Sequence, residues 1–181
     1  MKSTIKIFVV FAMVLSFAIV SKAQTNSDND KILGKATIIQ AMNVTKQIDL
    51  NFGIVSQGSN KTIGLSNDVT GLPNQGTQTT GRFLVSAAPT TSVKLTFTTP
   101  GNLVKGSDNL TIDTYTYGYG NTNDGSTATT FTGGTKDVTF PTNIVETVNG
   151  IYVFIGGTVK PSGTQAPGEY SADITLTATY N

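Results

Sequence analysis

The residues best suited to ligand chemistry in this chain lie between positions 113 and 119. In the stretch Asp-Thr-Tyr-Thr-Tyr-Gly-Tyr, alternation puts Asp113, Tyr115, Tyr117 and Tyr119 on one face of a strand. If Ile112 points into a core, these four side chains point to solvent. Exposed rings flanked by carboxylate and amide groups can stack on sugars and hydrogen-bond their hydroxyls. The pattern predicts a glycan-binding strip, with cross-strand tyrosine pairing or cover by residues 121–134 as the alternative.

Catalytic groups are scarce. The 181-residue chain has no histidine and no cysteine, which excludes Ser-His-Asp and Cys-His arrangements and zinc sites of the usual nitrogen and sulfur type. Two of its 11 carboxylates, for example Asp113 and Asp137, could in principle serve a glycosidase, but nothing in their spacing places them at the required separation. We therefore expect a protein that is not an enzyme.

No cofactor or metal site is expected either. The sequence Asn-Thr-Asn-Asp-Gly at 121–125 superficially suits calcium, but it lacks the spaced acidic residues and the distant bidentate glutamate of an EF-hand. A tight turn is the better interpretation of Asn-Asp-Gly.

The element that ends the chain has the clearest pattern. From 170 to 180 every second residue is apolar or aromatic, which predicts a half-buried strand. This face could pack on the protein's own core. It could also be an assembly face that a partner recognises, formed by Tyr170, Ile174, Leu176 and Tyr180.

Short alternating runs recur through the rest of the chain. A first strand is expected to carry Ala36, Ile38, Met42 and Val44 on one face, and a second to carry Ile48, Leu50, Phe52 and Ile54. With the terminal strand the total is about nine, and the other predicted strands are 61–66, 83–87, 93–97, 110–116, 138–140 and 151–159. No sustained helical period is present, so the sequence predicts an all-β, immunoglobulin-like antiparallel β-sandwich, with a jelly roll or small barrel as alternatives.

The N-terminus has the features of a secretion signal. Lys2 and Lys6 precede an apolar run over 7–20, and Ser-Lys-Ala at 21–23 fits a signal-peptidase site. We expect a signal peptide over 1–23, a flexible lead over 24–33 and a single domain over 34–181. The chain is then exported to the periplasm, the cell surface or beyond, with no transmembrane segment after cleavage. The full chain has 12 basic residues, and the mature chain without residues 1–23 has 9 basic and 11 acidic residues. They form no basic patch, so no nucleic-acid partner is expected.

Three segments carry a resemblance to a known family. They are Ile-Asp-Leu-Asn-Phe-Gly-Ile-Val at 48–55, Gly-Arg-Phe-Leu-Val-Ser-Ala at 81–87, and the stretch from Gly156 through Gly168-Glu169-Tyr170 to Tyr180. Their order and spacing resemble the domain-of-unknown-function family 4402 over most of residues 34–181. The resemblance implies an exported bacterial β-sandwich, and it supplies no catalytic residues.

The ending, Gly168-x-Tyr170 before an alternating strand and a penultimate Tyr180, is also similar to pilus subunits of chaperone-usher systems, including spore coat U-like pilins. Those pilins often carry a disulfide, which this chain cannot form. The similarity implies partners, itself or other surface subunits, that join by strand addition. Residues 31–45 could be the donated strand, with Ala36, Ile38, Met42 and Val44 filling a groove, or the first strand of a complete sandwich.

These observations predict a non-catalytic secreted or cell-surface protein with a structural or adhesive role, for example a subunit of a surface fibre. The alternative is a small glycan-binding module.

Overall fold

The computed structural model describes residues 30–181, so the predicted signal peptide and residues 24–29 of the predicted lead lie outside the described residues. Residues 38–181 form one compact unit. Residues 30–41 contain no helix or strand and are exposed. The first strand therefore begins at Asn43. The sequence pattern had predicted that it would also include Ala36 and Ile38, and this prediction is wrong.

The unit consists of two antiparallel sheets, which confirms the all-β sandwich. The larger sheet contains nine strands and the smaller three. The larger sheet comprises β1 (Asn43–Ile48), β2 (Lys61–Ile63), β3 (Val69–Thr70), β4 (Gly81–Ser86), β6 (Asn102–Lys105), β7 (Asp108–Gly120), β8 (Thr129–Phe131), β10 (Ile144–Val145) and β11 (Val148–Lys160). The smaller sheet comprises β5 (Ser92–Thr98), β9 (Thr135–Thr139) and β12 (Thr175–Tyr180), in the order β12-β5-β9.

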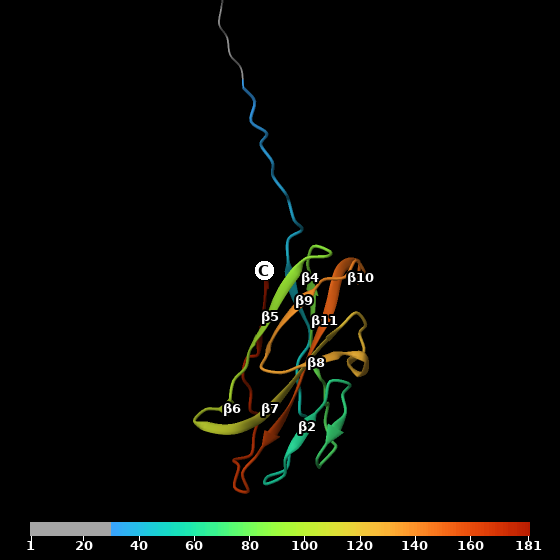
Figure 1. Ribbon diagram of the computed structural model, residues 1–181. Coiled ribbons are helices and arrows are strands. Elements are labelled where there is room, and N and C mark those ends of the chain that lie inside the picture. Colours follow the sequence, from blue (N-terminus) through green and yellow to red (C-terminus); the bar gives the residue numbers. More distant parts are fainter. Residues whose placement is uncertain (1–29) are drawn as a thin grey trace, which may run out of the picture. The chain divides into compact units, whose positions relative to one another are not determined.

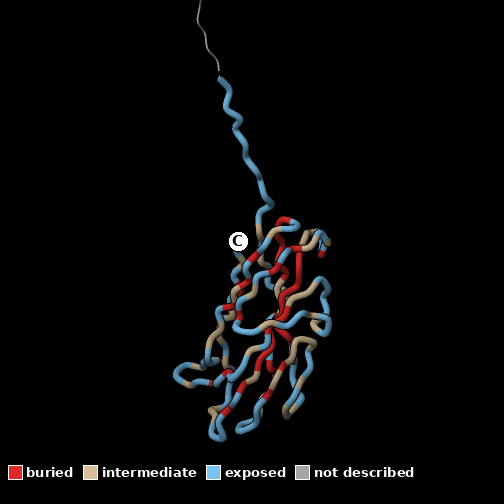
Figure 2. The backbone as a smooth tube through the Cα atoms, in the orientation of Figure 1, coloured by how far each residue is buried: buried red, intermediate tan, exposed pale blue. Residues whose placement is uncertain are grey.

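The long strand β11 organises the larger sheet (Figure 1). One edge of β11 pairs with β7, and the other pairs first with β4 and then with β2. The buried residues are concentrated along this strand (Figure 2). It is buried on both faces because Val153 points into the sandwich, whereas Tyr152 and Phe154 belong to a second cluster on the opposite face of the sheet.

The main core lies between the sheets. The smaller sheet contributes Val93 and Leu95 from β5, both fully buried, while Lys94 between them is exposed. This alternation is what a strand with one face on a core requires. A separate cluster, formed by Phe52, Ile63, Leu110, Ile112 and Val159, fills the end of the sandwich where β2 and β6 lie.

The predicted second strand over Ile48–Ile54 is not a strand. Beyond Ile48 its only pairing is an isolated bridge between Asn51 and Thr79. Gly53 adopts φ +65, and its N–H donates to the Asn51 side chain, so the chain turns there. As a result Phe52 is buried, whereas Ile54 is 53% exposed.

Candidate functional site, an apolar groove between two chain segments

A groove of about 960 Å³, with an apolar floor and polar residues on both walls, lies between two chain segments. Its first wall is residues 46–57, which include the end of β1, and its second wall is residues 165–174, which lead into β12. The floor between them is made of apolar side chains from the larger sheet: Phe83, Leu103, Leu110, Ile112 and Ile155.

Each wall forms backbone hydrogen bonds on its outer side. Asn51 exchanges two backbone hydrogen bonds with Thr79, at 2.9 and 3.0 Å. Ser171 likewise exchanges two with Val104, at 2.9 and 3.1 Å. In an extended chain the residues on either side of such a pair direct their N–H and C=O groups the opposite way.

The inner sides of the walls are therefore strand edges that face the groove. The backbone groups concerned belong to Leu50 and Phe52 on the first wall and to Tyr170 and Ala172 on the second. None of the four makes a backbone hydrogen bond to another residue within 30–181. Unpaired edges of this kind are templates for another strand.

Hydrogen bonds connect the two walls at one end of the groove, and one further bond connects their flanking segments beyond the other end. At one end the Gln57 amide donates to the Gln165 carbonyl at 2.6 Å, and Gly58 N–H donates to Ser162 at 3.0 Å. At the other end β1 and β12 approach each other, and the Tyr180 hydroxyl donates to the Gln40 carbonyl at 2.8 Å. Within residues 30–181 β1 pairs only with β4 and β12 only with β5, so neither strand has a ladder partner on its second edge.

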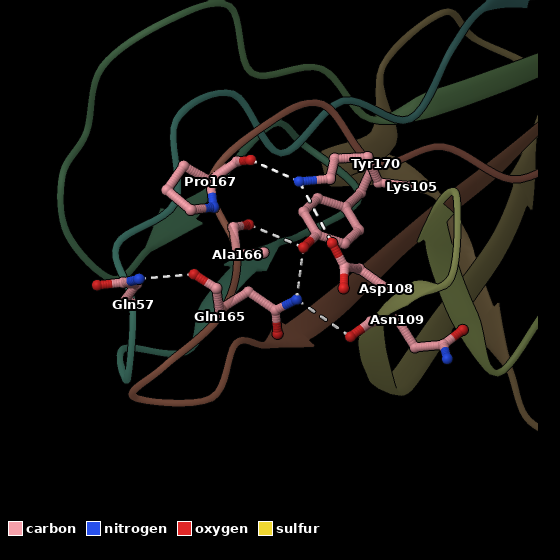
Figure 3. A network of polar contacts seen from close by, with 8 residues as sticks. All are labelled: Gln57, Lys105, Asp108, Asn109, Gln165, Ala166, Pro167 and Tyr170. Carbon is pink, nitrogen blue, oxygen red and sulfur yellow. Dashed lines mark hydrogen bonds and ion pairs between the residues drawn. The ribbon is translucent and has the colours of Figure 1, made fainter.

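A polar network fixes the second wall (Figure 3). The Gln165 amide donates to the Asn109 carbonyl and to the Tyr170 hydroxyl, which in turn donates to the Ala166 carbonyl. Lys105 donates to the Pro167 carbonyl at 2.7 Å. The wall is thus anchored to the β6–β7 hairpin through its outer side, and its inner side stays free.

A buried lysine fixes the first wall. Lys61 on β2 is fully buried, and its ammonium donates to the Ile54 carbonyl at 2.7 Å and the Pro73 carbonyl at 2.8 Å. Burial lowers the pKa of Lys61 from its ordinary value, because the charged form loses hydration. The two carbonyl contacts compensate part of that loss and tie the wall to the sheet.

The rim of the groove carries more negative than positive charge. Asp49, Glu169 and Asp173 line it, with Lys46 as the only basic residue among the lining side chains. Lys46 pairs with Asp49 at 3.1 Å. None of the three ion pairs found within residues 30–181 includes Glu169 or Asp173.

The predicted assembly face is divided between two environments. Tyr170 and Ile174 line the groove. Leu176 is buried in the main core, and Tyr180 packs against that core. The alternation predicted for 170–180 is present in the burial of its side chains, although the ladder begins only at Thr175.

The predicted tyrosine strip does not point to solvent. Tyr117 is 8% exposed and lies in the main core, in ring contact with Phe97 and Phe131. Tyr115 and Tyr119 are half-buried against the same core. The expected orientation is therefore wrong: all three rings pack against the core, and Tyr117 offers no exposed surface on which a sugar could stack. Glycan binding stays a prediction.

The physical reason is a bulge at Asp113. Thr114 pairs with Thr158, but Ile112 pairs with the adjacent Val159, so Asp113 is an extra residue in β7. The bulge reverses the alternation: Ile112 points inward before it, and the odd-numbered tyrosines point inward after it. Asp113 itself pairs with Lys160 at 2.9 Å.

The buried Tyr115 hydroxyl donates to the Pro100 carbonyl at 2.8 Å. Loss of hydration, with a smaller contribution from the neighbouring Tyr117, raises the pKa of Tyr115 to about 12. A phenol held protonated in this way is a structural donor.

The other candidate residues have local roles. Asp137 accepts a hydrogen bond from the Asn181 amide at 3.1 Å. Asp124 caps the short turn Gly125–Thr127 by accepting from Ser126 N–H. Hydrogen bonding by the Ser126 side chain, with a smaller contribution from its N–H, lowers the pKa of the Asp124 carboxyl. Over residues 30–181 no group of three or more His, Cys, Asp or Glu side chains could hold a metal ion. The same stretch contains no helix with the length and hydropathy to cross a bilayer.

Sequence reasoning missed the groove itself. Alternation at 48–54 was taken to mean a paired strand, whereas the segment is bonded on one side only. Gly53, followed by polar residues up to Gly58, was the available signal that a regular strand ends there.

Two antiparallel sheets around a core define a β-sandwich, and two of its chain segments each have an edge without backbone hydrogen bonds beside the groove. Residues 42–180 match the family described as Domain of unknown function (DUF4402), and the chain belongs to that family. This confirms the resemblance drawn from the sequence. Neither the curated proteins nor the solved structures contain a match.

Proposed function

We propose that this chain is an exported, non-catalytic structural or adhesive protein that assembles at the cell surface by accepting a β-strand from another polypeptide into its groove. The observation that carries the proposal is the pair of inward-facing edges at Leu50, Phe52, Tyr170 and Ala172.

The groove offers both things that strand addition requires. Main-chain hydrogen bonds to the edges give affinity, and apolar positions on the floor accept every second side chain. Each ladder hydrogen bond contributes about 0.5–1.5 kcal/mol net, and burying a large aliphatic side chain contributes about 1.5–3 kcal/mol. An inserted strand of several residues would therefore offset the loss of freedom on association.

Two sequence features support the same conclusion. The predicted signal peptide would deliver the chain to the compartment where surface fibres assemble. The ending similar to pilus subunits includes Tyr170, and that residue stands in the second wall. Both features fit a subunit that receives a strand.

The test compares the molar mass of three forms of the mature chain, measured by light scattering on a sizing column. Ala172→Arg places a long charged side chain in the groove. Thr177→Arg is the matched control, because Thr177 is exposed on β12 outside the groove. Wild type and T177R should form oligomers, and A172R should be monomeric with an unchanged circular dichroism spectrum. Monomeric wild type, or A172R oligomers equal to those of wild type, would refute the proposal.

A further inference from the structure

The segment Lys31–Ala41, here called the donor segment, contains no helix or strand in this structure. Its isoleucines are unusually exposed, with Ile32 98% and Ile38 96% accessible. We infer that the donor segment of one copy is the strand that fills the groove of a second copy. This inference rests on the proposed function and names the partner that the groove accepts.

The side-chain pattern of the donor segment fits the groove. In an extended chain Ile32, Gly34, Ala36 and Ile38 fall on one face, and Lys31 and Lys35 fall on the other. From Ile32 to Ile38 the first face has no polar side chain and suits a floor made of leucine, isoleucine and phenylalanine, whereas the other face alternates Lys31 and Lys35 with Leu33 and Ile39. Eleven extended residues span roughly 36 Å, and the two walls contain comparable numbers of residues, 46–57 and 165–174.

The charges fit in sign and in spacing. Lys31 and Lys35 are four residues apart, and the segment contains no acidic residue between 31 and 41. Glu169 and Asp173 on the second wall are also four residues apart, and both are exposed. Two strands side by side keep the same rise per residue, so both lysines can lie opposite both carboxylates at once.

The position of Gln40 favours a second copy over insertion into the chain's own groove. The Gln40 carbonyl is bound by Tyr180 where β1 and β12 approach each other. From there β1 runs toward the first wall, which begins at Lys46. Self-insertion would require the backbone to reverse direction at residues 38–41, whereas insertion into a second copy requires no reversal.

Single-cysteine variants provide the test, because the natural chain has no cysteine. Untagged mature chain carrying Lys31→Cys or Lys35→Cys is mixed with tagged chain carrying Glu169→Cys or Asp173→Cys and oxidised. Directly opposite residues on neighbouring strands come close enough for a disulfide. A mixed dimer, identified by its mass on a non-reducing gel, is expected.

The pairing pattern also gives the strand direction. Parallel insertion along the second wall predicts the disulfides 31–169 and 35–173, and antiparallel insertion predicts 31–173 and 35–169. Tagged Asn123→Cys is the control, because Asn123 is exposed and does not line the groove. It should give no mixed dimer above the level of random collision.

Charge reversal tests the same contact without oxidation. The double variant K31E/K35E should associate about 3- to 30-fold more weakly, since two exposed ion pairs are lost. Adding E169K/D173K to that chain should restore association. The restoration distinguishes a direct contact from a general effect of net charge.

The outcomes separate this inference from the proposed function. One outcome is that wild type forms oligomers that A172R abolishes while no mixed disulfide forms. In that case the groove accepts a different strand, and the assignment of residues 31–41 as the donated strand is refuted. If a K35C/D173C or K35C/E169C chain forms only an internal disulfide at monomer mass, the donor segment fills the groove of its own chain. The inference that it inserts into a second copy is then refuted. Monomeric wild type overturns both proposals.

Discussion

The two ends of the β1–β12 seam differ sharply. At the closed end β1 and β12 approach each other, the Tyr180 hydroxyl donates to the Gln40 carbonyl, and the side chains of both strands pack half-buried against the main core. At the groove end each wall is bonded only on its outer side, and the floor between the walls includes the buried Leu110, Ile112 and Ile155. Alternation is similar in both places, which shows that an apolar face does not specify whether a chain's own strands or another chain will cover it.

The largest effect is expected in the main core between the sheets. Tyr117→Ala removes a ring that packs between Phe97 and Phe131, and we expect a loss of about 3–5 kcal/mol in the free energy of unfolding. Urea denaturation followed by circular dichroism measures it. Thr116→Ala, at an exposed neighbouring position, is the control and should change stability little. A Tyr117→Ala loss below 1 kcal/mol would mean that the ring is not part of the core.

The first wall of the groove should depend on Lys61. Lys61→Met keeps the aliphatic stem but leaves the Ile54 and Pro73 carbonyls without their donor, so we expect a loss of about 2 kcal/mol. Hydrogen exchange should show faster amides in residues 49–57, while β5 is unaffected.

Lys61 also predicts a pH dependence of stability. Because its pKa is lowered in the fold, the unfolded chain binds more protons between that lowered value and 10.5. The contribution of Lys61 to stability should therefore rise with pH across that window, and Lys61→Met should remove this rise. Identical pH profiles for the two proteins below pH 10 would contradict the burial of its charge.

The seam itself can be opened at Tyr180. Its hydroxyl donates to the Gln40 carbonyl and accepts from Ala88 N–H, both at 2.8 Å. Tyr180→Phe should cost about 1–2 kcal/mol and speed hydrogen exchange at Ala88. If exchange at Ala88 is unchanged, the closed end is held by side-chain packing alone.

The smallest effect is expected at Tyr115, beside the groove floor. Tyr115→Phe loses one hydrogen bond to Pro100, about 1 kcal/mol. With a folded pKa near 12 against an ordinary 10, Tyr115 contributes stability that is complete below pH 10 and is lost as pH rises toward 12. Between pH 10 and pH 12 the free energy of unfolding of Tyr115→Phe should therefore fall less than that of wild type. An equal fall would mean that groups other than Tyr115 cause the loss of stability at alkaline pH.

Much of the fold follows from local pattern. The strands β5 and β11 were predicted close to their observed bounds, because β5 keeps an apolar side chain at every second position and β11 contains a continuous apolar run. The strand predicted over 170–180 begins only at Thr175. The short strands β3, β8 and β10 were not predicted. Two or three residues carry too little alternation, and these strands exist because a neighbouring strand pairs with them.

The sequence by itself determined the fold class and the family, since these depend on composition and alternation along the chain. Only the tertiary structure decided which way the tyrosines of β7 point, because one bulged residue at Asp113 reverses the alternation. It likewise decided that residues 49–57 form a wall bonded on one side. Pairing is made between distant segments, and no pattern within a single segment records whether its second edge finds a partner.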